Sequence, residues 1–170
     1  MNTLGIVGAA WGVGGIVAFV VHALYRMTTY GFSAYEYPFE WTHWALLWTW
    51  VPAMIWAEGY RGFHLSFSPM VAARAKYLAE HPRPLHVLLA PVFCLGLIHA
   101  TRGRFVRSGL LTVGITALVL LVRQLPQPWR GIVDLGVIVG LSIGVISMVL
   151  WAYRAFTDET FDRSPEVPTG

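Results

Sequence analysis

The sequence predicts an all-α protein: a polytopic bundle of about five transmembrane helices with one amphipathic helix at the membrane interface. Hydrophobic residues make up 56% of the chain and charged residues only 12%, whereas soluble domains carry about 25% charged residues. A domain of this size is mostly surface, so water could not accommodate so much apolar area. The apolar residues also gather in long runs, and roughly 20 such residues cross about 30 Å of hydrocarbon.

Five apolar runs are interpreted as spans, and their ends carry Trp, Tyr, Arg or Pro. Pro91 is expected to kink the third helix, because packed neighbours can satisfy the backbone groups that a proline frees. The fourth run is the shortest, so either Arg107 and Arg123 extend to the interface from its ends or the segment is re-entrant. The predicted spans are 4–24, 43–60, 84–101, 108–123 and 131–153.

The connector between the second and third runs contains the amphipathic helix, predicted at 69–80. Ser68 is its candidate N-cap and Pro69 its first helical residue. Its mixture of apolar and basic residues is typical of a helix that lies in the interface instead of crossing it. The chain is therefore predicted to form one transmembrane domain over 1–157, followed by a flexible acidic tail at 158–170.

The positive charge predicts a membrane environment and not a nucleic-acid partner. Basic residues stand singly or in small groups between apolar runs, without the stripe that a phosphate backbone needs. Five spans would place six Lys and Arg residues on each side, so the positive-inside rule gives no clear orientation. A cytoplasmic N-terminus is favoured, because the connector at 61–83 is the largest basic one. The expected partners are membrane lipids and other membrane subunits or a second copy.

Glycines at helical spacing mark one face in each of two predicted spans. In the fifth span they form a GxxxGxxxG run, and in the first span they form a similar groove. A missing side chain lets another helix approach closely, which supplies much of the attraction between helices in lipid. Two interpretations stay open: packing between this chain's own helices, or docking of a partner helix. The residues are Gly8, Gly12 and Gly15 in the first span and Gly136, Gly140 and Gly144 in the fifth.

Three histidines are candidate cofactor ligands, because five spans bring them to one membrane face. They are His22, His43 and His99. Two histidines from different helices can supply both axial ligands of a b-type haem, and His22 and His99 are the obvious pair. A bound pigment or another metal is an alternative, and the cofactor stays unknown. His86 and His99 are expected about 20 Å apart on one helix, so these two could not share a haem.

The opposite face gathers acidic residues and histidines, among them Glu58, His64 and Asp134. Two ion pairs are predicted on shared helix faces, between Glu58 and Arg61 and between Arg130 and Asp134. The sequence contains no HExxH motif, P-loop, GxSxG elbow or dinucleotide fingerprint. It therefore predicts no metal site, and a protein without catalysis is favoured over an enzyme.

Three further stretches together resemble an uncharacterised family of small bacterial multi-pass integral membrane proteins. The resemblance covers about residues 42 to 150 and implies the membrane topology, with no activity, cofactor or catalytic residue attached. The stretches are Glu58-Gly-Tyr-Arg-Gly-Phe63 running into Phe67-Ser-Pro69, Leu89-Ala-Pro-Val-Phe-Cys94 with His99-Ala-Thr-Arg102, and Val122-Arg-Gln-Leu-Pro-Gln-Pro-Trp-Arg-Gly131.

The functional hypothesis is an accessory or scaffold subunit of a larger membrane complex, of the electron-transfer or light-harvesting type by analogy alone. It follows from the absence of a catalytic set and from the two glycine faces. One alternative is a haem-binding electron carrier that uses His22 and His99. The other is a small transporter or lipid-modifying enzyme that uses the face of Glu58 and Asp134, since ionisable residues within a membrane are usually functional.

Overall fold

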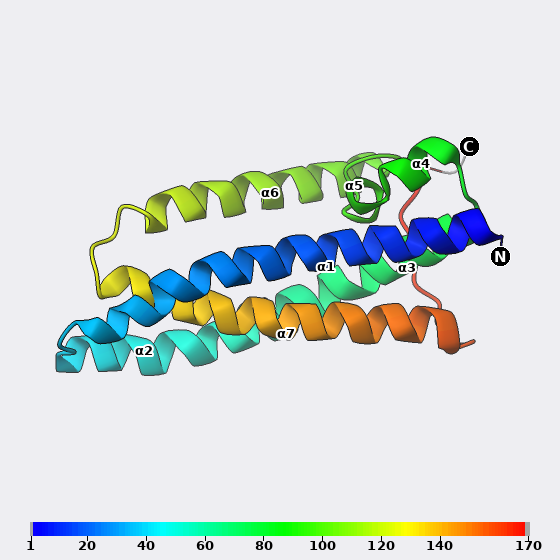
Figure 1. The fold of residues 1–170 in the computed structure, drawn as a ribbon. Coiled ribbons are helices and arrows are strands. Elements are labelled where there is room, and N and C mark those ends of the chain that lie inside the picture. The colour runs from blue at the N-terminus through cyan, green and yellow to red at the C-terminus, as the bar shows by residue number, and fades with distance from the viewer. Residues whose placement is uncertain (1, 169–170) are drawn as a thin grey trace.

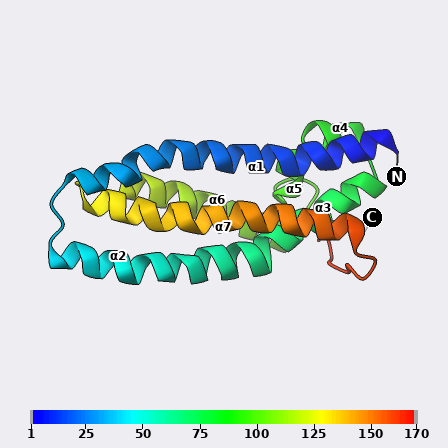
Figure 2. The ribbon, with the colours of Figure 1, turned by 60° about the horizontal axis from the view of Figure 1, so that its bottom comes forward.

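The computed structural model describes residues 2–168, and every regular element within them is helical. Figures 1 and 2 show long helices lying side by side, with both termini at one end of the bundle. The turn from α1 to α2 and the loop from α6 to α7 lie at the other end (Figure 1). The elements are α1 (Thr3–Phe32), η1 (Ser33–Glu36), α2 (Trp41–Met54), η2 (Ile55–Phe67), α3 (Ser68–Glu80), α4 (Pro84–Leu88), α5 (Ala90–Cys94), α6 (Arg102–Val122) and α7 (Trp129–Thr157).

Three helical stretches are long and apolar enough to cross a membrane, and they make the chain compatible with a membrane location. They are Thr3–Glu36, Arg102–Val122 and Trp129–Thr157, with mean hydropathies of 2.2, 2.1 and 2.3. The prediction of five spans is not confirmed. The fourth predicted span, 108–123, lies within α6, whose 21 residues extend about 31 Å. This helix is therefore long enough to cross without a re-entrant turn.

The expected span at 84–101 is not one helix. It forms α4 and α5, each of five residues, followed by an irregular segment that leads to α6. Pro91 has no backbone N–H to continue a helix from α4. Gly96 then adopts the left-handed conformation with φ of 74°, which glycine adopts at little cost. The segment folds over one end of the bundle (Figure 1).

The segment expected as an interfacial helix, 69–80, is helical but lies in the core. It belongs to α3, which continues from η2 and α2 without a break from Trp41 to Glu80. Met70, Ala75 and Leu78 on α3 belong to the hydrophobic core cluster and are at most 3% exposed. Alanines along α3 leave room for α1 and α7 to approach, and this close packing buries the helix on most of its surface.

Both glycine faces pack against this chain's own elements. A Cβ placed at Gly12 would lie 2.7 Å from the Sγ atom of Cys94, and one at Gly15 would lie 2.6 Å from Cγ of Pro91. Gly8 contacts Val87, Gly136 contacts Trp50, Gly140 contacts Glu58 and Gly144 contacts the ring of Phe63. Internal packing therefore accounts for these six glycines, and their faces are not free for a partner helix.

Replacing one of these glycines should destabilise the bundle, whereas a glycine on α6 gives a matched control. A Cβ at Gly140 would lie 2.7 Å from the Oε2 atom of Glu58, but one at Gly114 would have no atom within 4 Å. We expect Gly140→Leu to lower the stability by about 1–3 kcal/mol through overpacking, and Gly114→Leu to leave it unchanged. Thermal unfolding in mild detergent measures both. Equal unfolding temperatures for the two variants would contradict this packing.

Candidate functional site

The side chain of Arg74 is the most heavily bonded polar group of the bundle, although it is 0% exposed. Its Nε atom donates to the carbonyl of Phe93 at 2.6 Å, and one terminal nitrogen donates to the carbonyl of Pro165 at 2.8 Å. The other terminal nitrogen donates to the carbonyls of Ile98 and His99, at 2.8 and 3.0 Å. The guanidinium also stacks over the ring of Phe93, 4.3 Å from its centroid. One side chain thus satisfies four backbone carbonyls.

These bonds explain how the irregular segment after α5 is held. Its carbonyls have no helical partners, and leaving such groups buried and unpaired would cost about 1–3 kcal/mol each. His99 adopts φ of 45°, a left-handed conformation that is uncommon outside glycine, and its carbonyl accepts from Arg74. Ser108 of α6 adds a bond from its Oγ atom to the carbonyl of Leu95 at 2.9 Å. Arg74 is therefore a structural organiser of this end of the bundle.

The C-terminal segment is held against the bundle, where a flexible tail was expected. In addition to the bond from Arg74 to Pro165, the backbone N–H of Thr101 donates to the carbonyl of Glu166 at 3.0 Å. Phe161 packs edge-to-face on Trp151, with ring centroids 6.2 Å apart. The carbonyl of Pro165 thus provides one of the four acceptors of Arg74, and these contacts make the C-terminal segment part of the fold.

His86 and His99 lie together, contrary to the expectation that about 20 Å separates them. Their ring centroids are 4.8 Å apart, and both rings stack on Phe93. The expectation assumed one straight helix, which the break at α4 and α5 removes. Desolvation lowers the pKa of both histidines, with further lowering from the positive charges of Arg83 and Arg74 and, for His86, from His99. Both rings thus favour the neutral form.

The structure separates the two histidines that were paired as haem ligands. Gly8 of α1 lies against Val87, next to His86 and its neighbour His99. His22 lies 14 residues beyond Gly8, about 21 Å further along α1. His43 is 6% exposed, and its Nδ1 atom accepts from the backbone N–H of Glu40 at 3.0 Å. It caps the start of α2 and does not join the other two.

The predicted pair of Glu58 and Arg61 does not form. The guanidinium of Arg61 lies over the ring of Trp56, 5.0 Å from its centroid. Glu58 instead points into the interface with α7, where its Oε2 atom lies against Gly140, buried and without a hydrogen-bond partner in residues 2–168. Two turns away, His64 lies within 3.1 Å of the Oγ atom of Ser147. The interface of η2 and α7 therefore contains an acid, an imidazole and a hydroxyl.

Arg130 and Asp134 do lie together at the start of α7, with Nε and Oδ2 3.7 Å apart. The guanidinium of Arg130 also stacks over the ring of Tyr30 on α1, at 4.2 Å from its centroid. Gln127, in the loop before α7, donates to the carbonyl of Tyr30 at 3.2 Å and to Ser33 at 2.9 Å. These contacts join the loop between α6 and α7 to the end of α1.

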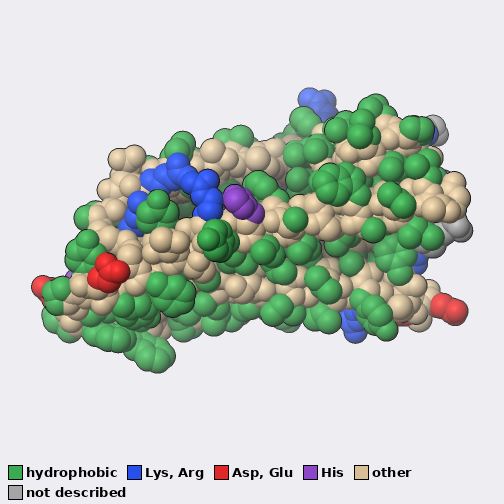
Figure 3. All heavy atoms as spheres, viewed as in Figure 1, with side chains coloured by type: hydrophobic (Ala, Val, Ile, Leu, Met, Phe, Trp, Pro, Cys, Tyr) green, Lys and Arg blue, Asp and Glu red, His purple; other side chains and the backbone are tan. Residues whose placement is uncertain are grey.

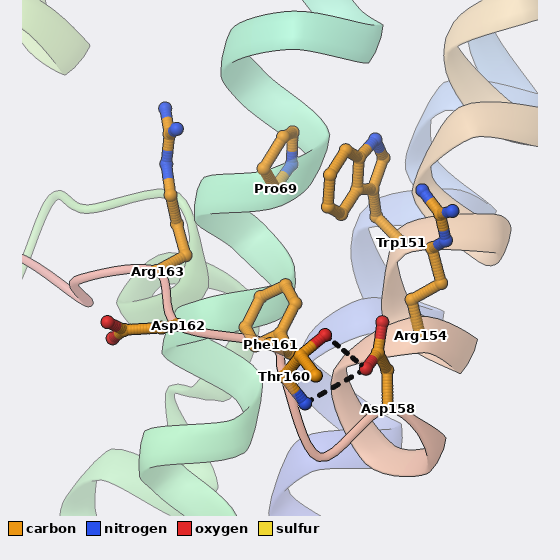
Figure 4. A pocket seen from close by; sticks show the side chains of 8 residues that line it. All are labelled: Pro69, Trp151, Arg154, Asp158, Thr160, Phe161, Asp162 and Arg163. Atoms are coloured by element: carbon orange, nitrogen blue, oxygen red, sulfur yellow. Dashed lines mark hydrogen bonds between the residues drawn. The ribbon is translucent and has the colours of Figure 1, made fainter.

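A pocket of about 270 Å³ lies where the C-terminal segment leaves α7. Figure 4 shows Asp158 at its edge, accepting hydrogen bonds from the backbone N–H of Thr160 at 2.9 Å and from its Oγ atom at 2.6 Å. These bonds lower the pKa of Asp158, and its carboxylate has its partners within the chain. The pocket is smaller than most ligand sites, and we assign no ligand to it.

Within the described residues, no group of three or more His, Cys, Asp or Glu side chains could hold a metal ion. No protein-family model, curated protein or solved structure matches this chain. The site must therefore be argued from the geometry of this chain alone. The buried role of Arg74 was not predicted from the sequence, because an arginine between alanines is typical of an exposed helix face. The one available signal was the string of small residues on both sides of it.

The hydrogen bonds of Arg74 predict that its loss would open the end of the bundle. Arg74→Met removes four bonds to a charged donor, each worth about 1.5–3 kcal/mol, so we expect a loss of at least about 3 kcal/mol. Arg74→Lys should restore little, because an ammonium lacks the planar fork that reaches carbonyls on several segments.

Cys94 provides the measurement, since it is the one cysteine of the chain and is 0% exposed. Labelling of Cys94 by a maleimide should be slow in the unmodified protein and much faster in both variants. Arg107→Met, at an exposed position of α6, is the control. Equally slow labelling in Arg74→Met would rule out the assigned role.

Proposed function

We propose that this chain is a multi-pass membrane protein that acts by assembling with another membrane protein, as an accessory or scaffold subunit. The observation that supports this is helix α6. It is an apolar helix of 21 residues with a mean hydropathy of 2.1, and every residue from Leu110 to Leu121 is exposed. The chain therefore supplies an apolar helix that its own bundle leaves uncovered.

The outer face of α6, defined as Leu110, Gly114, Ala117 and Leu121, supports a helical partner. Its spacing of four, three and four residues is that of a helix–helix contact. Gly114 and Ala117 would let a partner backbone approach, and leucines at both ends would pack around it. Ser108, which contacts Leu95, lies on the opposite side of α6, so this face points away from the rest of the chain.

The glycine faces of α1 and α7 support the same assignment by contrast. The space beside their glycines is occupied by Cys94, Pro91, Glu58 and Phe63, whereas nothing lies within 4 Å of a Cβ placed at Gly114. We further propose that the continuous helix from Trp41 to Glu80 crosses the membrane beside α1 and α7. Four crossings would then put both termini on one side, in agreement with their common end in Figure 1.

Co-purification tests this proposal. From native membranes in mild detergent, the chain should bring down a second membrane protein or a second copy of itself. Gly114→Leu should reduce that amount by roughly tenfold, because a side chain there separates the helices. Leu118→Ala, beside the outer face on α6, is the control and should have little effect. A chain that purifies alone, with no change in cross-linked species between variants, would overturn the assembly role.

A second candidate function, movement of a proton or cation, is favoured by Glu58. A carboxylate within an apolar bundle is costly and usually functional, and the Oε2 atom of Glu58 has no hydrogen-bond partner in the described part of the chain. Glu58 lies in the first turn of η2, a π-helical stretch of 13 residues, and π-helical geometry is rare outside functional sites and bulges. His64 and Ser147 extend the polar groups along the same interface.

Reconstituted vesicles with an internal pH-sensitive dye distinguish this second function. A transporting protein should acidify the vesicles under an imposed gradient, and Glu58→Gln should abolish the flux, since an amide cannot carry the proton. Glu36→Gln, at an exposed position of η1, should leave it intact. Vesicles that stay as tight as protein-free ones would exclude proton movement.

A further inference from the structure

One face of α1 is uncovered beyond the point where it contacts α5. Gly15 on α1 packs against Pro91 of α5, the element that leads into α6. His22 and Arg26 lie within about 20° of Gly15 around the helix, so they point to the same side. Yet both are exposed, and Phe19 beside them is 74% exposed. Nothing in residues 2–168 covers this face of α1 beyond the contact with α5.

The matching face of α6 is equally uncovered. Ile115 and Val119 lie within about 20° of Ser108 around the helix, and Ser108 points towards the bundle through its bond to Leu95. Ile115 is nevertheless 53% exposed and Val119 42% exposed. Apolar side chains of both helices are thus uncovered, namely Phe19 on α1 and Ile115 and Val119 on α6. In a membrane, acyl chains are as apolar as these side chains and would cover them.

Positive charges lie at one end of these faces. Figure 3 shows Lys or Arg side chains beside one histidine, between the places that α6 and α1 take in Figure 1. Arg26 is four residues before Tyr30 on α1, so it lies on the same face one turn away. Arg130 of α7 stacks on Tyr30 itself. Arg123 ends α6 just before the loop that Gln127 joins to Tyr30.

These charges are largely without acceptors inside the chain. Asp134 is the one carboxylate within ion-pair distance of any of the three arginines in residues 2–168, at 3.7 Å from the Nε atom of Arg130. That nitrogen is buried and has no hydrogen-bond partner in the same residues. Arg26 and Arg123 are exposed and form no ion pair within them. An anion would therefore find accessible N–H donors on the exposed side chains of Arg26 and Arg123.

We propose that one anionic phospholipid binds between α1 and α6. Its phosphate accepts from Arg26 and Arg123, with Arg130 and His22 at the rim, because guanidinium groups match phosphate geometry. Its acyl chains run between Phe19 and the inner face of α6 towards α5, which closes the far end. The lipid thereby attaches α6 to the bundle. The side chains of α6 themselves contact the rest of residues 2–168 only near Ser108. This inference rests on the membrane placement above, and not on a protein partner of α6.

Native mass spectrometry of the full chain in detergent tests the site. Delipidated protein should bind one dioleoyl-phosphatidylglycerol tightly, and dioleoyl-phosphatidylcholine of the same chains at least roughly tenfold more weakly, a difference of about 1.4 kcal/mol. Arg26→Gln should weaken phosphatidylglycerol binding by a similar factor, and Arg26→Lys should retain most of it. Arg102→Gln, at the opposite end of α6, is the matched control. All these positions are exposed, so folding should persist.

Three results would overturn the proposal. Equal affinities for the two lipids would mean that the arginines do not distinguish the anionic phosphatidylglycerol headgroup from the zwitterionic phosphatidylcholine headgroup. An equal loss in Arg26→Gln and Arg102→Gln would reduce the effect to general charge. Stabilisation by inorganic phosphate that phosphatidylglycerol does not exceed would identify a phosphate site without a lipid. Gly114→Leu, which should impair assembly, is expected to leave lipid binding unchanged, so failure of the partner role and failure of the lipid site are distinguishable.

Discussion

The fold depends on the buried guanidinium of Arg74. A cation taken into an apolar bundle loses its water, at a cost of several kcal/mol unless hydrogen bonds replace it. The carbonyls of Phe93, Ile98, His99 and Pro165 replace that water. Only a backbone segment outside a regular helix can offer carbonyls in this number. The buried arginine and the broken backbone thus stabilise each other, and neither would persist alone.

The hydrogen bonds of Arg74 also determine the direction in which the chain continues after α5. With residues 84–101 folded over one end, they do not cross the bundle, and α6 starts at the same end as α1. The C-terminal segment returns to that end and supplies Pro165 as an acceptor. One consequence is that His86 and His99 meet on Phe93, while His22 and His43 stay towards the other end. A haem pair of His22 and His99 has no support in this arrangement.

The glycine faces of α1 and α7 are covered by other residues of the chain, whereas Gly114 of α6 is not. The glycines of α1 and α7 are covered by Cys94, Pro91 and Phe63, and they set the close packing of the core. Gly114 on α6 is covered by nothing. This contrast supports the proposed helical partner on the outer face of α6 and the proposed acyl chains on its inner face.

The sequence by itself determined the helical class, the membrane character and the positions of α1, α6 and α7, because apolar runs of the required length have few other solutions. Its spacing also placed Arg130 beside Asp134, one helical turn away. Only the tertiary structure decided the role of Arg74, the burial of 69–80 and the break at Pro91. The role of Arg74 depends on contacts between residues 19 to 91 positions apart, with Phe93 and Pro165, and residues 69–80 are buried by α1 and α7, which are distant from them in the sequence. Local periodicity carries no information about such contacts, so it predicted an interfacial helix at 69–80 and a membrane span at 84–101.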